Sequence, residues 1–214
     1  MSHVKVAKLI LMLMVSASAM LVAGCGSSSG GGGNSNALPG PVGERLMGRY
    51  QPLGDDQAIV LDTITGLAWQ RCSLGQTWSN RNQRCTGTLT LLDWPAAAAF
   101  ESDDGFSLPT FDELATLVFC SNEQDQPEEI GTADLNDGCS GGISPTILPN
   151  VFPDTEQRTY WTLDASPGSP NLRLGVNFTS GFISDNNAQR TRYAIRLVRD
   201  ASDLVESNAP ETAE

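Results

Sequence analysis

Short apolar segments separated by turn residues predict β-strands on both sides of the chain's centre. Apolar residues over 58–61 and 67–71 flank the turn sequence 62–66, and this arrangement predicts a β-hairpin. The last third of the chain predicts four further strands, over 159–163, 172–178, 181–184 and 193–199.

Two helices are predicted between these groups of strands. Asp93 is placed to cap a helix over 94–101, whose second residue is a proline that the first turn tolerates. Thr110 and Glu113 form a capping box ahead of apolar residues at helical spacing, and residues 103–105 between the two helices are expected to form a turn. Central helices between terminal strands predict an α+β fold whose terminal strands share one sheet.

The first 24 residues have the pattern of a secretory signal. Two lysines precede an apolar run over 9–23, which is shorter than the roughly 20 residues of a spanning helix. Cys25 follows small residues in the pattern of a bacterial lipobox, so we expect cleavage before Cys25 and lipidation of its thiol. Gly26 stands where an Asp would indicate inner-membrane retention, which favours the outer membrane.

Composition divides the remainder into three parts. Residues 25–43 are rich in Gly, Ser and Pro and predict a flexible tether, whereas 201–214 predict an acidic, disordered tail. Residues 44–200 are long enough for one domain with its own core. Within them, 122–150 form a long acidic excursion of the kind that is often functional.

Removal of the signal would also remove His3 and both lysines. The remaining 11 arginines face 25 acidic residues, so the expected mature charge is −14. Without His or Lys, serine or cysteine hydrolysis with a histidine base, His-ligated zinc and pyridoxal chemistry are excluded. A carboxylate pair is the remaining ordinary catalytic device. Nucleic acid is not expected as a partner, since the positive charge gathers only at Arg190, Arg192, Arg196 and Arg199, which we interpret as one solvated face of the final strand.

Besides Cys25 there are four cysteines, an even number in a protein expected to be exported. Three pairings exist, and proximity favours Cys72 with Cys85 and Cys120 with Cys139. Each bridge would stabilise the fold by roughly 3 kcal/mol in the chain-entropy model. A metal site is the alternative, but the spacing lacks a close cysteine pair.

Four motifs in order resemble a known family. They are Thr65-Gly66-Leu67-Ala68-Trp69-Gln70-Arg71-Cys72, Leu108-Pro109-Thr110 followed by Asp112-Glu113-Leu114, Tyr160-Trp161-Thr162, and Ala194-Ile195-Arg196-Leu197-Val198-Arg199. Over about residues 50–200 the chain resembles the family named after the C-terminal domain of the Legionella collagen-like adhesin. The resemblance implies a single C-type-lectin-like domain on a bacterial surface protein or lipoprotein, with adhesion to sulfated glycans known for the naming member. A strongly acidic surface without lysine argues against a sulfated ligand here.

Aromatic and acidic residues supply the candidate ligand contacts. Trp69 and Trp161 lie in strand-like segments and are expected in the core, whereas Trp78, with Arg81 nearby, is the aromatic expected to be exposed for a sugar ring. Asp134, Asn136 and Asp137 are a candidate calcium site, although a solvated turn is the simpler interpretation.

These observations predict a lipid-anchored module of the cell envelope that acts in binding or adhesion and has no catalysis of its own. A glycan is the candidate ligand, the membrane is a partner through the lipid, and no cofactor is expected. Two alternatives stay open: a structural or protein-binding envelope lipoprotein without a glycan ligand, and a glycan-active enzyme that uses carboxylates.

Overall fold

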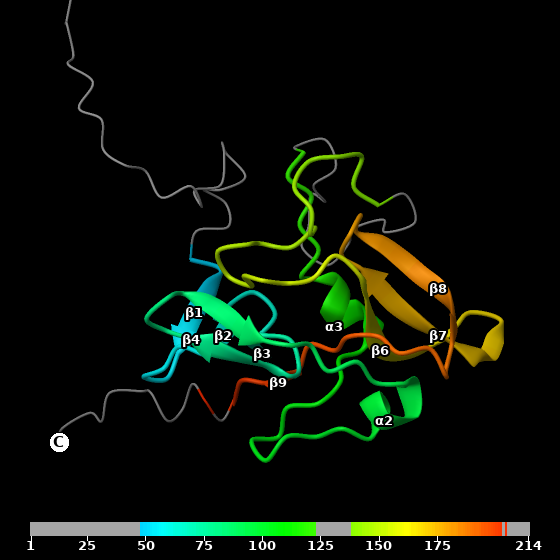
Figure 1. Cartoon of the computed structure of the whole chain (residues 1–214), viewed down its shortest axis with the longest axis horizontal. Helices are drawn as coiled ribbons and strands as arrows, with labels where there is room; N and C mark the ends of the chain where they lie inside the picture. Colours follow the sequence, from blue (N-terminus) through cyan, green and yellow to red (C-terminus); the bar gives the residue numbers. More distant parts are fainter. Residues whose placement is uncertain (1–47, 123–137, 203, 205–214) are drawn as a thin grey trace, which may run out of the picture. The chain divides into compact units, whose positions relative to one another are not determined.

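The computed structural model describes residues 48–122, 138–202 and 204, all within one compact unit (Figure 1). Strands predominate over two short helices in this part of the chain, which is consistent with the predicted α+β class. The elements are β1 (Tyr50–Leu53), β2 (Ile59–Asp62), β3 (Leu67–Gln70), β4 (Gln76–Ser79), β5 (Arg84–Gly87), α2 (Trp94–Ala98), α3 (Phe111–Ala115), β6 (Thr159–Ser166), β7 (Ser169–Asn177), β8 (Phe182–Ala188) and β9 (Val198–Asp200).

The first sheet confirms that the two ends of the domain meet. Its strand order is β1-β2-β3-β9, so the last strand pairs with the predicted β2–β3 hairpin. The turn of that hairpin ends at Gly66, whose φ of +71° is a conformation that glycine adopts without strain. β7 lies between β6 and β8 in a second, antiparallel sheet, and β4 pairs with β5 in a separate hairpin.

The predicted strand over 193–199 is wrong over most of its length, because only β9 is regular there. Tyr193 pairs with Leu92 and Ala194 with Tyr160, each through an isolated bridge. The carbonyl of Ile195 accepts from the amide of Leu74 at 3.1 Å. Backbone groups of this segment therefore bind several different parts of the chain. The segment connects these parts and does not pair along its length with one neighbouring strand.

Both helices begin where predicted and are short. The side chain of Asp93 accepts from the amide of Ala96, and Thr110 and Glu113 form the complete capping box. α2 ends at Ala98, before the predicted end at residue 101, because the chain turns back and Glu101 forms a bridge with Ser107. The turn predicted at 103–105 lies within this loop.

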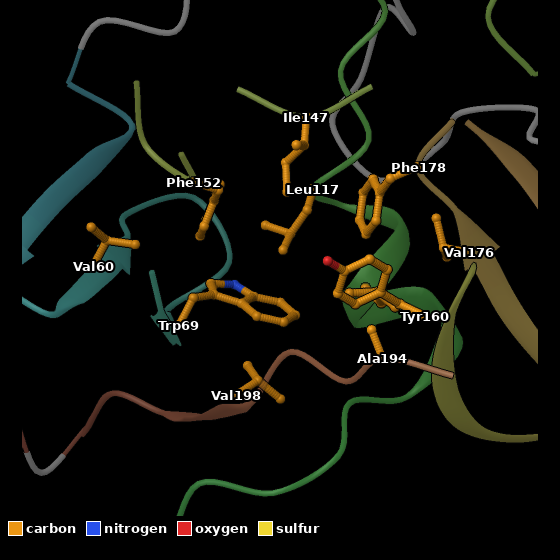
Figure 2. Packing of buried hydrophobic residues seen from close by; sticks show 11 residues of the cluster. Val60, Trp69, Leu117, Ile147, Phe152, Tyr160, Val176, Phe178, Ala194 and Val198 are labelled. Carbon is orange, nitrogen blue, oxygen red and sulfur yellow. The ribbon is translucent and has the colours of Figure 1, made fainter. Parts of the chain in front are cut away.

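Beside a small cluster of Phe119 and Leu148, two large apolar clusters form the core. One joins the two sheets and contains Trp69, Tyr160 and Phe178, which are 0 % exposed (Figure 2). The other surrounds Trp161 and Phe106, also 0 % exposed. The core positions predicted for Trp69 and Trp161 are thus confirmed. No helix among the described residues is long and apolar enough to cross a membrane.

Candidate functional site: the disulfide-closed hairpin

A disulfide joins β5 of the β4–β5 hairpin to the segment that precedes β4. Cys72 and Cys85 are bonded with their Cα atoms 5.6 Å apart, which is the pairing favoured by sequence proximity. β4 and β5 are joined through residues 80–83, where Arg81 is exposed. The hairpin therefore presents Arg81 to solvent on a cross-linked support.

Trp78 does not have the exposure expected of it. It lies opposite Cys85 in the antiparallel register, so both side chains project from the same face of the hairpin. Cys85 is buried, and this face is turned toward the domain. The guanidinium of Arg71 lies 3.8 Å from the centre of the Trp78 ring, and within the described structure the buried indole nitrogen has no hydrogen-bond partner. Trp78 is therefore half-buried and packs against Arg71 as part of the structural support of the hairpin.

Asp154 attaches the hairpin to the loop at 150–155. Its carboxylate accepts from the Arg84 guanidinium at 2.8 Å and from the amide of Cys85 at 2.9 Å. Gln76 donates from its side chain to the carbonyl of Asp154 at 3.4 Å. One residue of this loop thus binds both strands of the hairpin.

Arg71 binds the same loop, 150–155, through its guanidinium. It donates to the carbonyls of Val151 and Asn150, both at 2.9 Å, and only 5 % of it is exposed. Burial lowers the pKa of Arg71. The residue therefore combines two backbone contacts with the stacking contact to Trp78.

Arg196 is fully buried below the hairpin. Its Nη1 donates to the carbonyls of Gln70 at 3.0 Å and Arg71 at 2.6 Å. Its Nη2 donates to the hydroxyls of Ser73 at 3.3 Å and Thr155 at 2.7 Å. Burial lowers the pKa of Arg196 to about 10, so the side chain remains a cation at neutral pH. No described carboxylate forms an ion pair with it.

Burial of Arg196 overturns the prediction that four arginines form one solvated face. Arg190 and Arg192 are exposed, whereas Arg196 is 0 % exposed. Arg199 is partly buried and donates to the carbonyl of Asp104 at 2.7 Å. The predicted alternation fails because residues 193–197 are not a surface strand, so side chains on both of their sides meet other parts of the domain.

Unusual backbone conformations occur in the connection of the hairpin and in two loops beside it. Gln57, Gln83 and Asp154 are the described non-glycine residues with positive φ, at 57°, 50° and 56°. Such conformations are uncommon outside glycine and cluster at functional sites. The Arg71 guanidinium lies 3.5 Å from the Gln57 carbonyl, and Asn80 donates to the Asp55 carbonyl at 3.5 Å. We call residues 54–58, 76–87 and 150–155 together the hairpin corner.

The sequence pointed to part of this site only. Arg81 lies at the hairpin corner, as does Trp78 in its different role. Arg71, Asp154 and Arg196 were missed as contributors. Arg71 and Arg196 stand inside the recognised motifs, which is the signal that could have identified them.

Other predicted sites lie elsewhere or outside the described residues. Cys120 and Cys139 form the second predicted disulfide, with Cα atoms 5.3 Å apart. The lipidation site Cys25 and the calcium candidates Asp134, Asn136 and Asp137 fall outside the described part of the chain, as do the signal 1–24 and the tether 25–43. Within that part, no group of three or more His, Cys, Asp or Glu side chains is placed to hold a metal.

A shallow hollow of about 360 Å³ lies where β9 leaves the first sheet. Asp200 is the one carboxylate among the described residues that line it, and hydrogen bonds from Ser202 lower its pKa. The lining residues are Leu61, Thr63, Thr65, Gly66, Asp200, Ala201 and Ser202. The hollow thus offers a single acidic group and otherwise small or apolar side chains.

Comparison with known proteins assigns the family. A search of curated proteins and a search of solved structures each found no significant match. The family model described as the Lcl C-terminal domain matches residues 58–199, well over half of the chain. This family indicates an adhesin-like or binding module, and the match spans both disulfides, both helices and the hairpin corner except residues 54–57. The chain therefore belongs to the Lcl C-terminal domain family.

Proposed function

We propose that this protein is a lipid-anchored binding module of the cell envelope, that it engages its ligand through the hairpin corner, and that it has no catalysis of its own. A C-type-lectin-like fold is part of the proposal. Its support is the pairing of terminal strands in one sheet, with two helices between the strand groups. The anchor rests on the lipobox pattern at Cys25.

One observation carries the assignment of the hairpin corner: three strained non-glycine residues lie in or beside a hairpin that a disulfide cross-links to the chain before it. Such strain costs of order 1–3 kcal/mol per residue and persists where the surroundings impose it. Arg81, Asp55 and Asp56 are exposed there and offer donors and acceptors. A glycan hydroxyl uses both, so the proposed ligand is a glycan bound mainly through hydrogen bonds.

The test is a broad glycan array with the full chain carrying Cys25→Ser, with and without calcium. We expect saturable binding that Arg81→Ala weakens at least fivefold, because the side chain is exposed and would contact the ligand. Arg190→Ala is the matched control, since Arg190 is also exposed but lies in the turn after β8. Equal binding by both variants would contradict the assignment to the hairpin corner. Loss of binding on chelation would instead implicate calcium at Asp134, Asn136 and Asp137.

A protein ligand is the second candidate, and the packing of Trp78 favours it. Arg71 covers one face of the indole, which reduces the area available to a sugar ring. This alternative would be supported if no glycan on the array bound the protein and if the protein captured an envelope protein. Arg81→Ala should abolish that capture.

The anchor has its own test. Cys25→Ser should release the protein from bacterial membranes, because the thiol would carry the acyl chains that hold it there. Separation of inner and outer membranes should place the unmodified protein in the outer membrane. If the Cys25→Ser variant still sediments with membranes after an alkaline wash, the lipoprotein assignment fails.

A further inference from the structure

Figure 1 shows that α2 begins beside the ends of β7 and β8. Three arginines belong to the segments that meet the start of α2: Arg173 lies in β7, and Arg190 and Arg192 follow β8. The guanidinium of Arg173 lies 3.7 Å from the centre of the Trp94 ring. Arg192 holds the carbonyl of Leu91 with its Nε at 3.1 Å and its Nη2 at 2.7 Å. The amide of Trp94 donates to the carbonyl of Gln189 at 2.9 Å, so these segments are in direct contact. We call Arg173, Arg190 and Arg192 around this tryptophan the arginine face.

The arginine face has no acidic partner in the described part of the chain. None of its three arginines forms an ion pair with a described carboxylate. Arg173 stacks on Trp94, and its buried Nε has no hydrogen-bond partner among the described residues. Arg190 is exposed. The neighbouring Asp93 already accepts from the amide of Ala96 at 3.1 Å. The face therefore offers several cationic donors in a chain whose net charge is −12.

The chain itself contains a segment of complementary charge. Residues 203–214 hold four acidic residues and no basic one: Asp203, Glu206, Glu211 and Glu214. Ten residues follow Leu204, and fully extended they would span at most about 35 Å. Carboxylates are the groups that arginine guanidinium forks bind best, often through two parallel hydrogen bonds.

We propose that the arginine face binds the acidic segment 203–214 of this chain. Three cations match a short segment with spaced carboxylates. A long sulfated glycan would extend beyond the arginine face over a surface of net negative charge, which repels it. The interaction does not depend on the hairpin corner or its ligand.

The first experiment compares the full chain with a variant that carries Asp203→Asn, Glu206→Gln, Glu211→Gln and Glu214→Gln. We expect the Nε–H resonances of Arg173, Arg190 and Arg192 to differ between the two proteins at low salt, and the difference to shrink at about 1 M salt, where screening acts within about 3 Å. If the arginine resonances do not change with protein concentration, the arginine face binds the acidic segment of its own chain. If they do change with concentration, it binds the acidic segment of a second copy. Unchanged arginine resonances at low salt would overturn the proposal.

The second experiment adds a peptide of residues 203–214 to that neutralised variant. We expect saturable binding that Arg190→Gln with Arg192→Gln weakens about fivefold or more, as two lost exposed ion pairs would. Arg81→Gln, a change at an exposed arginine of the hairpin corner, should leave binding unchanged. Equal loss with Arg81→Gln would overturn the proposal, as would tighter binding of a peptide of residues 123–137. Binding of heparin fragments at this face without binding of the peptide would assign it to sulfated glycans instead.

Discussion

Buried arginines, and not the aromatic side chain at its centre, organise the hairpin corner at the scale of single residues. Arg196 donates to two carbonyls and two hydroxyls, and Arg71 donates to two further carbonyls. A buried cation without a carboxylate is costly unless hydrogen bonds replace its hydration. These contacts do so for both Nη atoms of Arg196, whereas its buried Nε has no hydrogen-bond partner among the described residues. They connect β3, the segment before the hairpin and the loop that carries Asp154.

Removal of Arg196 should therefore cost more than removal of an exposed arginine. Arg196→Met leaves two carbonyls and two hydroxyls without this donor, so we expect the free energy of unfolding to fall by about 3 kcal/mol or more. Arg196→Lys keeps the charge and part of the donors and should lose less. Urea unfolding measures both, with Arg192→Met as the exposed control. A loss below about 1 kcal/mol for Arg196→Met would contradict the structural role described above.

Tyr50 links stability to alkaline pH. Burial raises the pKa of Tyr50 well above its ordinary value, while neighbouring Arg49 lowers it by less. Above the ordinary tyrosine pKa of about 10, the unfolded chain loses this proton and the folded chain keeps it. The free energy of unfolding should then fall as pH rises through that value.

Tyr50→Phe should remove this contribution. Urea midpoints of the wild type and Tyr50→Phe, measured from pH 8 to 11, should diverge above about pH 10, with the wild type losing stability relative to the variant. Because Tyr50 remains partly exposed, the divergence should be smaller than for a fully buried phenol. Midpoints that stay parallel throughout would show that Tyr50 ionises alike in both states.

At the scale of elements, the predicted secondary structure agrees best with the observed one where local sequence signals are strong. The hairpin over β2 and β3, the two helix caps and the turn at 103–105 were all anticipated, because turn and capping residues act on their immediate neighbours. β1, β4 and β5 were not predicted. β4 and β5 have little apolar alternation, and such a hairpin is marginal alone. The disulfide and Asp154 supply what the pattern lacks.

Loss of the Cys72–Cys85 disulfide should therefore loosen the β4–β5 hairpin selectively. With Cys72→Ala and Cys85→Ala, we expect stability to fall by roughly 3 kcal/mol and amide exchange over residues 76–87 to accelerate. The matched control, Cys120→Ala with Cys139→Ala, should leave exchange of the hairpin unchanged relative to overall stability. Protection of the hairpin that survives the first pair of changes would show that Asp154 and Arg71 suffice.

At the scale of the whole molecule, both ends of the domain converge on the turn between β2 and β3. The amide of Thr63 donates to the carbonyl of Arg49 at 2.8 Å, and the amide of Ala201 donates to the carbonyl of Gly66 at 3.0 Å. Ala201 is 1 % exposed, and Leu204 packs against the cluster around Trp161. Packing thus continues beyond residue 200, the boundary expected from composition.

A shortened chain tests this boundary. A fragment of residues 44–200 should be less stable than one of residues 44–204 by about 1–3 kcal/mol, because it loses the partial burial of Leu204, the burial of Ala201 and a backbone hydrogen bond. Thermal and urea unfolding of the two fragments supply the comparison. Equal stability would place the boundary back at residue 200.

Local sequence patterns determined the family resemblance of this protein, whereas contacts between distant residues determined the site and the burial of its charged side chains. The order of short motifs, the cysteine spacing and the local caps are properties of neighbouring residues, so the sequence alone determined the family resemblance and the starts of the helices. It also favoured, among three possible pairings, the two disulfides that the structure shows. Whether a side chain is exposed depends on which residues from distant parts of the chain pack against it. Only the tertiary structure decided that Trp78 lies under Arg71, that Arg196 is buried while Arg192 is not, and that Asp154 reaches the hairpin, because each outcome depends on contacts across roughly 7 to 125 positions of the chain.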